Sequence, residues 1–112
     1  MSDMIVAKTI LAQLGGNRFV RMTGARHLSA HSNDLSFRLP SGGFTRSGIN
    51  FVRITLTPMD VYKVAFFKLG RAPRRDVTLI SEHDDIYAED LQKLFTRETG
   101  LQTSLGTMGA SS

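Results

Sequence analysis

The sequence predicts a single α+β domain, in which an antiparallel sheet of about four to five strands is flanked by an N-terminal and a C-terminal helix. Three observations predict this fold class. The 112 residues are enough for one hydrophobic core. Apolar residues recur at helical spacing near both ends of the chain, and runs rich in β-branched and aromatic residues lie between them.

Both predicted helices are marked by apolar stripes and by glycines that end them. The first covers residues 4–14 and stops at Gly15 and Gly16. The second has acids in its first turn, which complement the helix dipole, and a glycine cap at Gly100. Its predicted apolar stripe consists of Tyr87, Leu91, Leu94 and Phe95.

Five segments are predicted to be strands, and a meander is the simplest arrangement for them. They cover residues 17–23, 35–39, 49–56, 61–69 and 77–80. The second alternates apolar and polar residues, and the third is rich in β-branched residues. A turn around Pro58 joins the third to the fourth as a hairpin. Between the strands lie a polar stretch at 24–34 and basic, glycine-containing loops at 40–48 and 70–75.

Composition excludes several kinds of site. The chain has no cysteine, which rules out disulfides, thiolate catalysis and cysteine-ligated metal centres. No apolar run approaches the roughly 18 residues of a membrane-spanning helix, and the first four residues lack the features of a signal peptide. We therefore expect a cytoplasmic protein with one domain over residues 1–102, followed by a disordered tail over residues 103–112.

Charge is distributed unevenly along the chain, behind a net charge of only +4. Residues 4–75 carry twelve Lys or Arg against two acids, whereas residues 76–98 carry seven acids against two cations. The predicted sheet and its loops are therefore basic, and the segment leading into the last helix is acidic. Whether the acidic segment neutralises the basic sheet stays open at the level of sequence.

Aromatic side chains interleave with cations on the predicted strands, a combination that binds single-stranded nucleic acid because rings stack on bases and cations pair with phosphates. Arg21 and Arg53 are predicted to share strand faces with Phe19 and Phe51. The candidate residues for binding nucleic acid or a protein partner are Arg18, Phe19, Arg21, Arg38, Arg46, Phe51, Arg53, Arg71, Arg74 and Arg75. Two other interpretations are a basic face that meets an acidic protein and a solvated surface without a partner.

Two clusters of titratable residues raise the question of catalysis or metal binding. His27 and His31 stand four apart, but neither the glutamate of a zinc-protease helix nor a third ligand accompanies them. The second cluster consists of Glu82, His83, Asp84 and Asp85. These four would have to converge in a pocket to support an enzyme, and acids before a helix ordinarily serve its N-terminus. No catalytic residue, metal or cofactor is therefore predicted.

Several runs of the chain resemble a set of small uncharacterised proteins carried by bacteriophages, prophages and other mobile elements. The runs are ILAQLGGNRF (10–19), MTGA (22–25), NFVRITL (50–56), MDVY (59–62) and ETGL (98–101). The resemblance spans about residues 10 to 105 and includes no catalytic motif. It implies a context, the cytoplasm of a bacterial host, in which small proteins often act by stoichiometric binding.

The resemblance and the charge pattern together give a leading hypothesis and two alternatives. The leading hypothesis is a non-catalytic binding protein that inhibits a host defence nucleoprotein complex, as anti-CRISPR proteins do. The first alternative is an accessory protein that binds single-stranded DNA or RNA directly. The second is a structural or assembly protein of the phage, which would associate with copies of itself through an exposed sheet edge.

Overall fold

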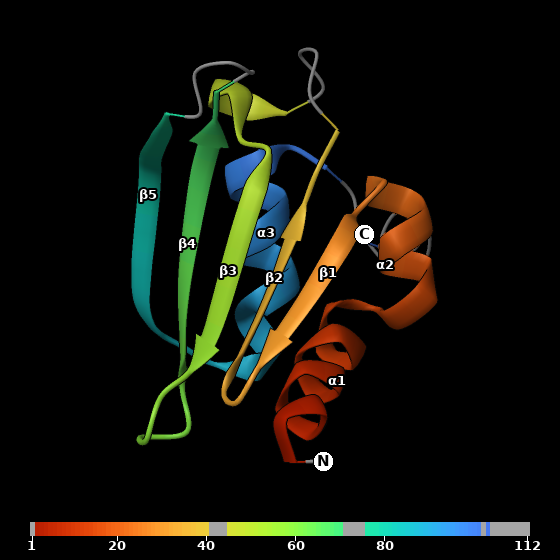
Figure 1. The fold of residues 1–112 in the computed structure, drawn as a ribbon, viewed down its shortest axis with the longest axis vertical. Helices are drawn as coiled ribbons and strands as arrows, with labels where there is room; N and C mark the ends of the chain where they lie inside the picture. The colour runs from red at the N-terminus through yellow and green to blue at the C-terminus, as the bar shows by residue number, and fades with distance from the viewer. Residues whose placement is uncertain (1, 41–44, 71–75, 102, 104–112) are drawn as a thin grey trace.

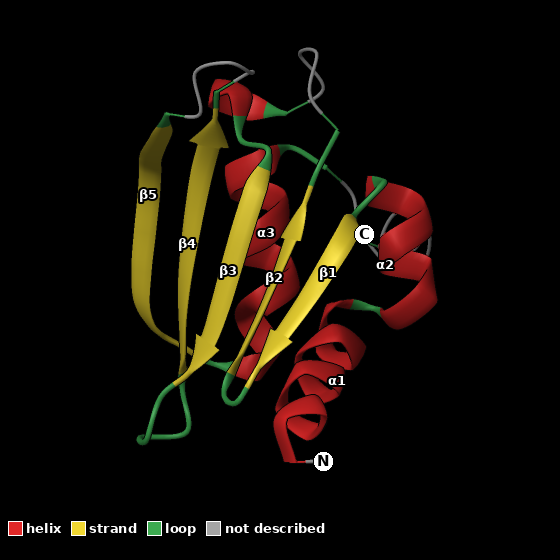
Figure 2. Ribbon diagram, viewed as in Figure 1, coloured by secondary structure: helices red, strands yellow, loops and turns green. Residues whose placement is uncertain are grey.

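The protein is a two-layer α+β domain, seen in a computed structural model that describes residues 2–40, 45–70, 76–101 and 103 (Figures 1 and 2). One antiparallel sheet has the strand order β1-β2-β3-β4-β5, so the predicted meander is confirmed. Its strands are β1 (Arg26–His31), β2 (Asp34–Arg38), β3 (Phe51–Leu56), β4 (Tyr62–Leu69) and β5 (Val77–Ile86). The helices are α1 (Ser2–Leu14), α2 (Gly16–Thr23) and α3 (Leu91–Thr99), with short 3-10 helices η1 (Arg46–Gly48) and η2 (Ala88–Asp90).

Residues 16–23 form the helix α2, so the prediction of a strand over 17–23 is wrong. Phe19 and Thr23 lie one helical turn apart and are both buried, and the Thr23 hydroxyl donates to the Phe19 carbonyl oxygen at 2.8 Å. Gly24 ends the helix with φ 74 and donates its N–H to Val20. A Cβ at Gly24 would lie 2.8 Å from the Pro40 side chain. Both this close approach and the positive φ require glycine at this position.

The strand that replaces the mispredicted one is β1, which lies within the stretch at 24–34 that was assigned no structure. Its sequence, RHLSAH, lacks β-branched and aromatic residues because it is an edge strand with little buried surface. At the other edge β5 runs six residues past its predicted end at 80 and includes the acids of the second titratable cluster. Backbone pairing with β4 supports this extension, although β5 side chains are mostly exposed.

Helices pack on one face of the sheet around a common core (Figure 1). Phe19 of α2 meets Phe37 of β2 and Phe95 of α3 edge-on, with ring centroids 5.3 and 5.1 Å apart. The side chain of Gln92 donates to the carbonyl oxygens of Gln13 and Leu14, which are left free at the end of α1. All three helices are thereby joined to each other and to the sheet.

The C-terminal helix is confirmed with one change to its stripe. Leu91, Leu94 and Phe95 are buried, but Tyr87 precedes the helix and is 57% exposed. Gly100 caps the helix with φ 81, as predicted. The predicted tail lies outside the described residues, except for its first residue, Thr103, which is buried.

A buried tyrosine ties the first helix to the sheet. The Tyr62 hydroxyl donates to Gln13 Oε1 at 2.7 Å. Burial raises the pKa of Tyr62. The hydroxyl therefore stays protonated and serves as a fixed donor between β4 and α1. None of the described helices has the length and apolar character needed to cross a membrane.

Candidate binding surface on the open face of the sheet

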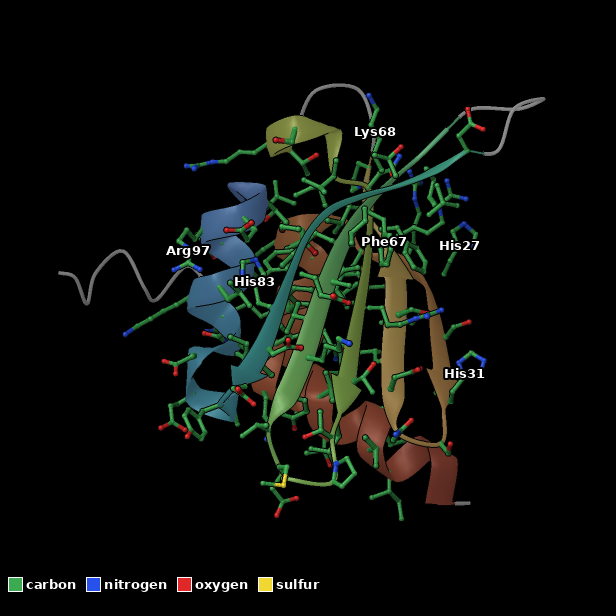
Figure 3. The ribbon with its side chains drawn as sticks, turned by 90° about the vertical axis from the view of Figure 1, so that its left-hand side faces the viewer. His27, His31, Phe67, Lys68, His83 and Arg97 are labelled. Carbon is green, nitrogen blue, oxygen red and sulfur yellow. The ribbon has the colours of Figure 1, made fainter. Side chains whose placement is uncertain are left out.

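The sheet has one face that no described helix covers, and we call it the open face. Strand side chains alternate between the two faces, so the ladder of cross-strand pairs identifies its members. They are Arg26, Ser29 and His31 on β1, Asp34, Ser36 and Arg38 on β2, Phe51, Arg53 and Thr55 on β3, Lys63, Ala65, Phe67 and Leu69 on β4, and Val77, Leu79 and Glu82 on β5. In Figure 3, Phe67 and the β1 histidines lie on this side, and His83 lies on the side of α3.

One row of the open face crosses all five strands, and its chemistry changes from cationic to apolar along the way. Arg26 pairs with Arg38, Arg38 with Phe51, Phe51 with Phe67, and Phe67 with Leu79. We call these five residues the Arg–Phe row. Since neighbouring strands lie about 4.8 Å apart, the row places two guanidinium groups directly beside two rings and an exposed leucine.

The two rings of the row form a cross-strand aromatic pair. The centroids of Phe51 and Phe67 are 5.7 Å apart and the ring planes are tilted by 58°. Both side chains are half-buried, and the apolar surface continues outward through Leu79, which is 52% exposed. A pair of phenylalanines on the outside of a sheet offers flat apolar surface to a ligand rather than to the core.

The two arginines of the row are directly opposite each other, which is an unfavourable arrangement for like charges. Within the part of the chain that the structure describes, neither Arg26 nor Arg38 forms an ion pair, and Arg53 forms none either. All three are exposed. Their positive charge is thus available to an anionic ligand.

The acidic segment leaves most of this charge uncompensated, which answers the question that the sequence left open. Its acids lie directly before or on the edge strand β5, on η2 and on α3, whereas the three arginines lie on β1, β2 and β3. Among the described residues, the one open-face cation that pairs with this segment is Lys63, whose Nζ lies 3.7 Å from Glu82 Oε2. Both side chains are nearly half exposed, so the contact is weak.

Seven of the ten predicted interface residues lie in the described part of the chain, where they occupy four different settings. Arg38, Phe51 and Arg53 lie on the open face. Arg18 and Arg21 are exposed on α2, not on a strand. The prediction for Phe19 as a stacking ring is wrong, because its side chain is fully buried in the core.

The remaining four predicted residues are not part of the open face as described. Arg46 lies in η1, and its side chain covers Gly100, where a Cβ would approach the guanidinium Nε to 3.3 Å. A cation at this position faces the C-terminal end of α3, where it complements the helix dipole. Arg71, Arg74 and Arg75 lie outside the described residues.

Three members of the Arg–Phe row were not predicted from the sequence: Arg26, Phe67 and Leu79. Arg26 was missed because β1 carries no strand signal. Phe67 was missed because the run VAFFKL in β4 is nearly continuously apolar, which hides the alternation between faces. The partner strand held the missing signal: Phe51 on β3 lies opposite Phe67, so fixing the register of the hairpin identifies the outward ring.

The members of the two titratable clusters do not converge on a common site. Glu82 lies on the open face with Lys63, whereas His83 contacts Glu98 of α3 on the other side. His31 Nδ1 lies 3.3 Å from Asp34 Oδ1, and His27 lies at a bulge in β1 with φ 55. Among the described residues, no three side chains of His, Asp or Glu are placed to hold a metal ion.

Glu98 instead anchors α3 to β5. Its Oε1 accepts a hydrogen bond from the Ser81 hydroxyl at 2.8 Å. The same oxygen lies 3.4 Å from His83 Nε2, which is not aligned for a hydrogen bond, and Arg97 Nε lies 3.5 Å from Oε2. Burial by itself would raise the pKa of Glu98, but the bond from Ser81 and the contacts of His83 and Arg97 outweigh it and lower the pKa. Glu98 is therefore held ionised.

No protein-family model, curated protein or solved structure matches this chain.

Proposed function

We propose that this protein acts by stoichiometric binding and that the open face of the sheet is its binding surface. The single observation that carries the proposal is the Arg–Phe row, which combines exposed cations that form no ion pair with any described residue and two half-buried rings on the outside of the sheet. Neither feature belongs to the buried core beneath the helices. Residues that are locally unfavourable for folding, such as two like charges opposite each other, and that gain no compensating contact are characteristic of functional surfaces.

The chemistry of the open face and the resemblance to mobile-element proteins indicate a nucleoprotein complex of a bacterial host as the target. Such a complex offers both phosphates, which pair with arginine, and flat groups, which pack on phenylalanine. Occupying its nucleic-acid channel or covering its nucleic acid would inhibit it. A host defence complex, the target of anti-CRISPR proteins, is the leading case.

Two features of the edge strands argue against the alternative role in phage assembly through sheet edges. The pairing of β1 with β2 and of β5 with β4 is interrupted by register shifts, at which residues adopt left-handed conformations: His27 has φ 55 and Asp85 has φ 56. The edge strand β5 also carries three acids. Bulges and charges are the devices by which edge strands avoid pairing with another copy.

The proposal is tested by capture of complexes from bacterial lysate with two matched triple variants. The open-face variant combines Arg26→Ala, Arg38→Ala and Arg53→Ala, and the control combines Lys8→Ala, Arg18→Ala and Lys93→Ala at exposed positions of the helices. Both lose three cations. We expect the native protein and the control to recover the same nucleic-acid-processing complex and the open-face variant to lose it. Equal recovery by both variants would contradict the proposal.

A further inference from the structure

We propose that the component held by the open face is single-stranded nucleic acid, with bases stacked on Phe51 and Phe67 and phosphates paired with Arg26 and Arg38. This inference rests on the proposed function and names the ligand of the same surface. It follows from the order of residues in the Arg–Phe row, where the cations occupy one end and the rings the other.

The row matches the cross-section of an exposed strand of nucleic acid. A nucleotide has an anionic backbone on one side and a flat base on the other, separated by the sugar. In the row, two guanidinium groups on β1 and β2 are followed by two rings on β3 and β4. A backbone that follows β1 and β2 would direct its bases across the sheet onto the rings.

A second row on the open face supports the same path. Arg53 lies two residues from Phe51 on β3, a step of about 6.6–6.8 Å along the strand. Its cross-strand neighbours, Ser36 and Ala65, are small and buried, whereas the side chain of Arg53 is long and exposed. Arg53 is therefore placed to reach a neighbouring phosphate or the edge of a stacked base.

The rings favour a single strand over a duplex and over an acidic protein. In a duplex the base faces are stacked on each other, so the two phenylalanines would have nothing flat to cover. The carboxylates of an acidic peptide would pair with Arg26 and Arg38 but would not themselves stack on the two rings, whose centroids are 5.7 Å apart. Two rings at this distance suit two neighbouring bases.

The test is the anisotropy of a fluorescent 12-nucleotide oligo(dT) or oligo(rU) titrated with the protein over a range of salt concentrations. We expect binding that weakens steeply with salt. The variant Arg26→Ala/Arg38→Ala should lower the slope of log K against log salt by about 1.4, since each phosphate contact on a single strand contributes about 0.7. Lys93→Ala, on an exposed site of α3, is the charge control and should leave the slope unchanged.

The stacking contribution is measured with Phe51→Leu and Phe67→Leu, which keep apolar bulk on the sheet and remove the ring. Each should weaken binding about fivefold or more at every salt concentration without changing the slope. Tyr87→Leu removes an exposed ring that lies after the end of β5, outside the Arg–Phe row, and should have no effect. Circular dichroism establishes that each variant is folded.

Three results would overturn the inference, and the first two separate it from the proposed function. If no single strand binds at low salt while the open-face arginines are still needed to capture a complex from lysate, the ligand is a protein component and the proposed function stands. If neither occurs, both proposals are wrong. Equal binding of a duplex of the same sequence, with no dependence on the phenylalanines, would show that the open face binds polyanions in general. This result would overturn the stacking model.

Discussion

The two faces of the sheet are built from the same five strands and serve different ends. On the covered face, cross-strand neighbours such as Phe37, Val52 and Phe66 are fully buried beneath the helices. On the open face, the neighbours one residue along are Arg38, Phe51 and Phe67, which are exposed or half-buried. A single residue step thus separates side chains that form the core of the domain from side chains that contribute less to its stability.

The comparison shows how to recognise a binding surface on a small domain without a visible catalytic site. Outward-facing positions of a solvated sheet tolerate almost any polar residue, and opposite charges there would be favourable. The open face instead places two arginines opposite each other and two phenylalanines beside them. Its composition is explained by a ligand better than by solvation.

The largest expected difference between the faces lies in the cost of removing a ring. Phe37→Ala should lower the free energy of unfolding by about 3–5 kcal/mol, because it opens a cavity among Phe19 and Phe95. Phe67→Ala should cost about 1–2 kcal/mol, since its ring is only half-buried. Urea denaturation of both variants measures the difference. Equal losses would mean that the open face is part of the core.

Carboxylates on the two sides of the sheet should also differ in how much they contribute to the free energy of unfolding. Glu98→Gln weakens the anchor of α3 and should cost about 1 kcal/mol at neutral pH. Because the folded-state pKa of Glu98 is lowered, its contribution is present above the unfolded value of 4.5 and is lost as pH falls through the folded value. The advantage of the native protein over the variant should therefore shrink below about pH 4.5, as followed by thermal melting at several pH values.

The matched control for this anchor is Glu82→Gln on the open face, which disturbs only the weak pair with Lys63. It should change the free energy of unfolding by less than about 0.5 kcal/mol at any pH. If Glu82→Gln lowered the free energy of unfolding as much as Glu98→Gln, the ion pair between Lys63 on β4 and Glu82 on β5 would be a structural contact.

The smallest expected effect has the opposite sign. Arg38→Thr removes the repulsion from Arg26 and should raise the free energy of unfolding by about 0.2–1 kcal/mol. Arg53→Thr makes the same chemical change beside Ser36 and Ala65, where no like charge is relieved, so it should stabilise less. Chemical denaturation compares the two. A destabilised Arg38→Thr variant would show that Arg38 has a structural role.

Sequence patterns predicted the fold class and the central hairpin because those elements are buried on one face and show it in their periodicity. Val52 and Ile54 alternate with exposed residues on β3, as a half-buried strand requires. The patterns failed at α2, where the polar and apolar residues of RFVRMT fit a strand and a helix equally well over so short a run. Burial of Phe19 and Thr23 in the tertiary structure decides for the helix.

The candidate surface was predictable only in part, because it depends on the register between strands that the sequence does not encode locally. Arg38, Phe51 and Arg53 were identified from the pattern of cations and aromatic residues on the predicted strands. The Arg–Phe row exists because β1 occupies the edge and brings Arg26 opposite Arg38, and because the hairpin register sets Phe51 opposite Phe67. These pairings are properties of the assembled sheet.

The most direct test of the binding surface is a two-dimensional NMR titration of the isotope-labelled protein with the 12-nucleotide single strand. We expect the amide and side-chain signals of the open-face residues to shift together, while those of α3 stay in place; these residues are Arg26, Arg38, Phe51, Arg53 and Phe67. Shifts confined to the helices, or an unperturbed open face at saturating oligonucleotide, would contradict the proposed binding surface.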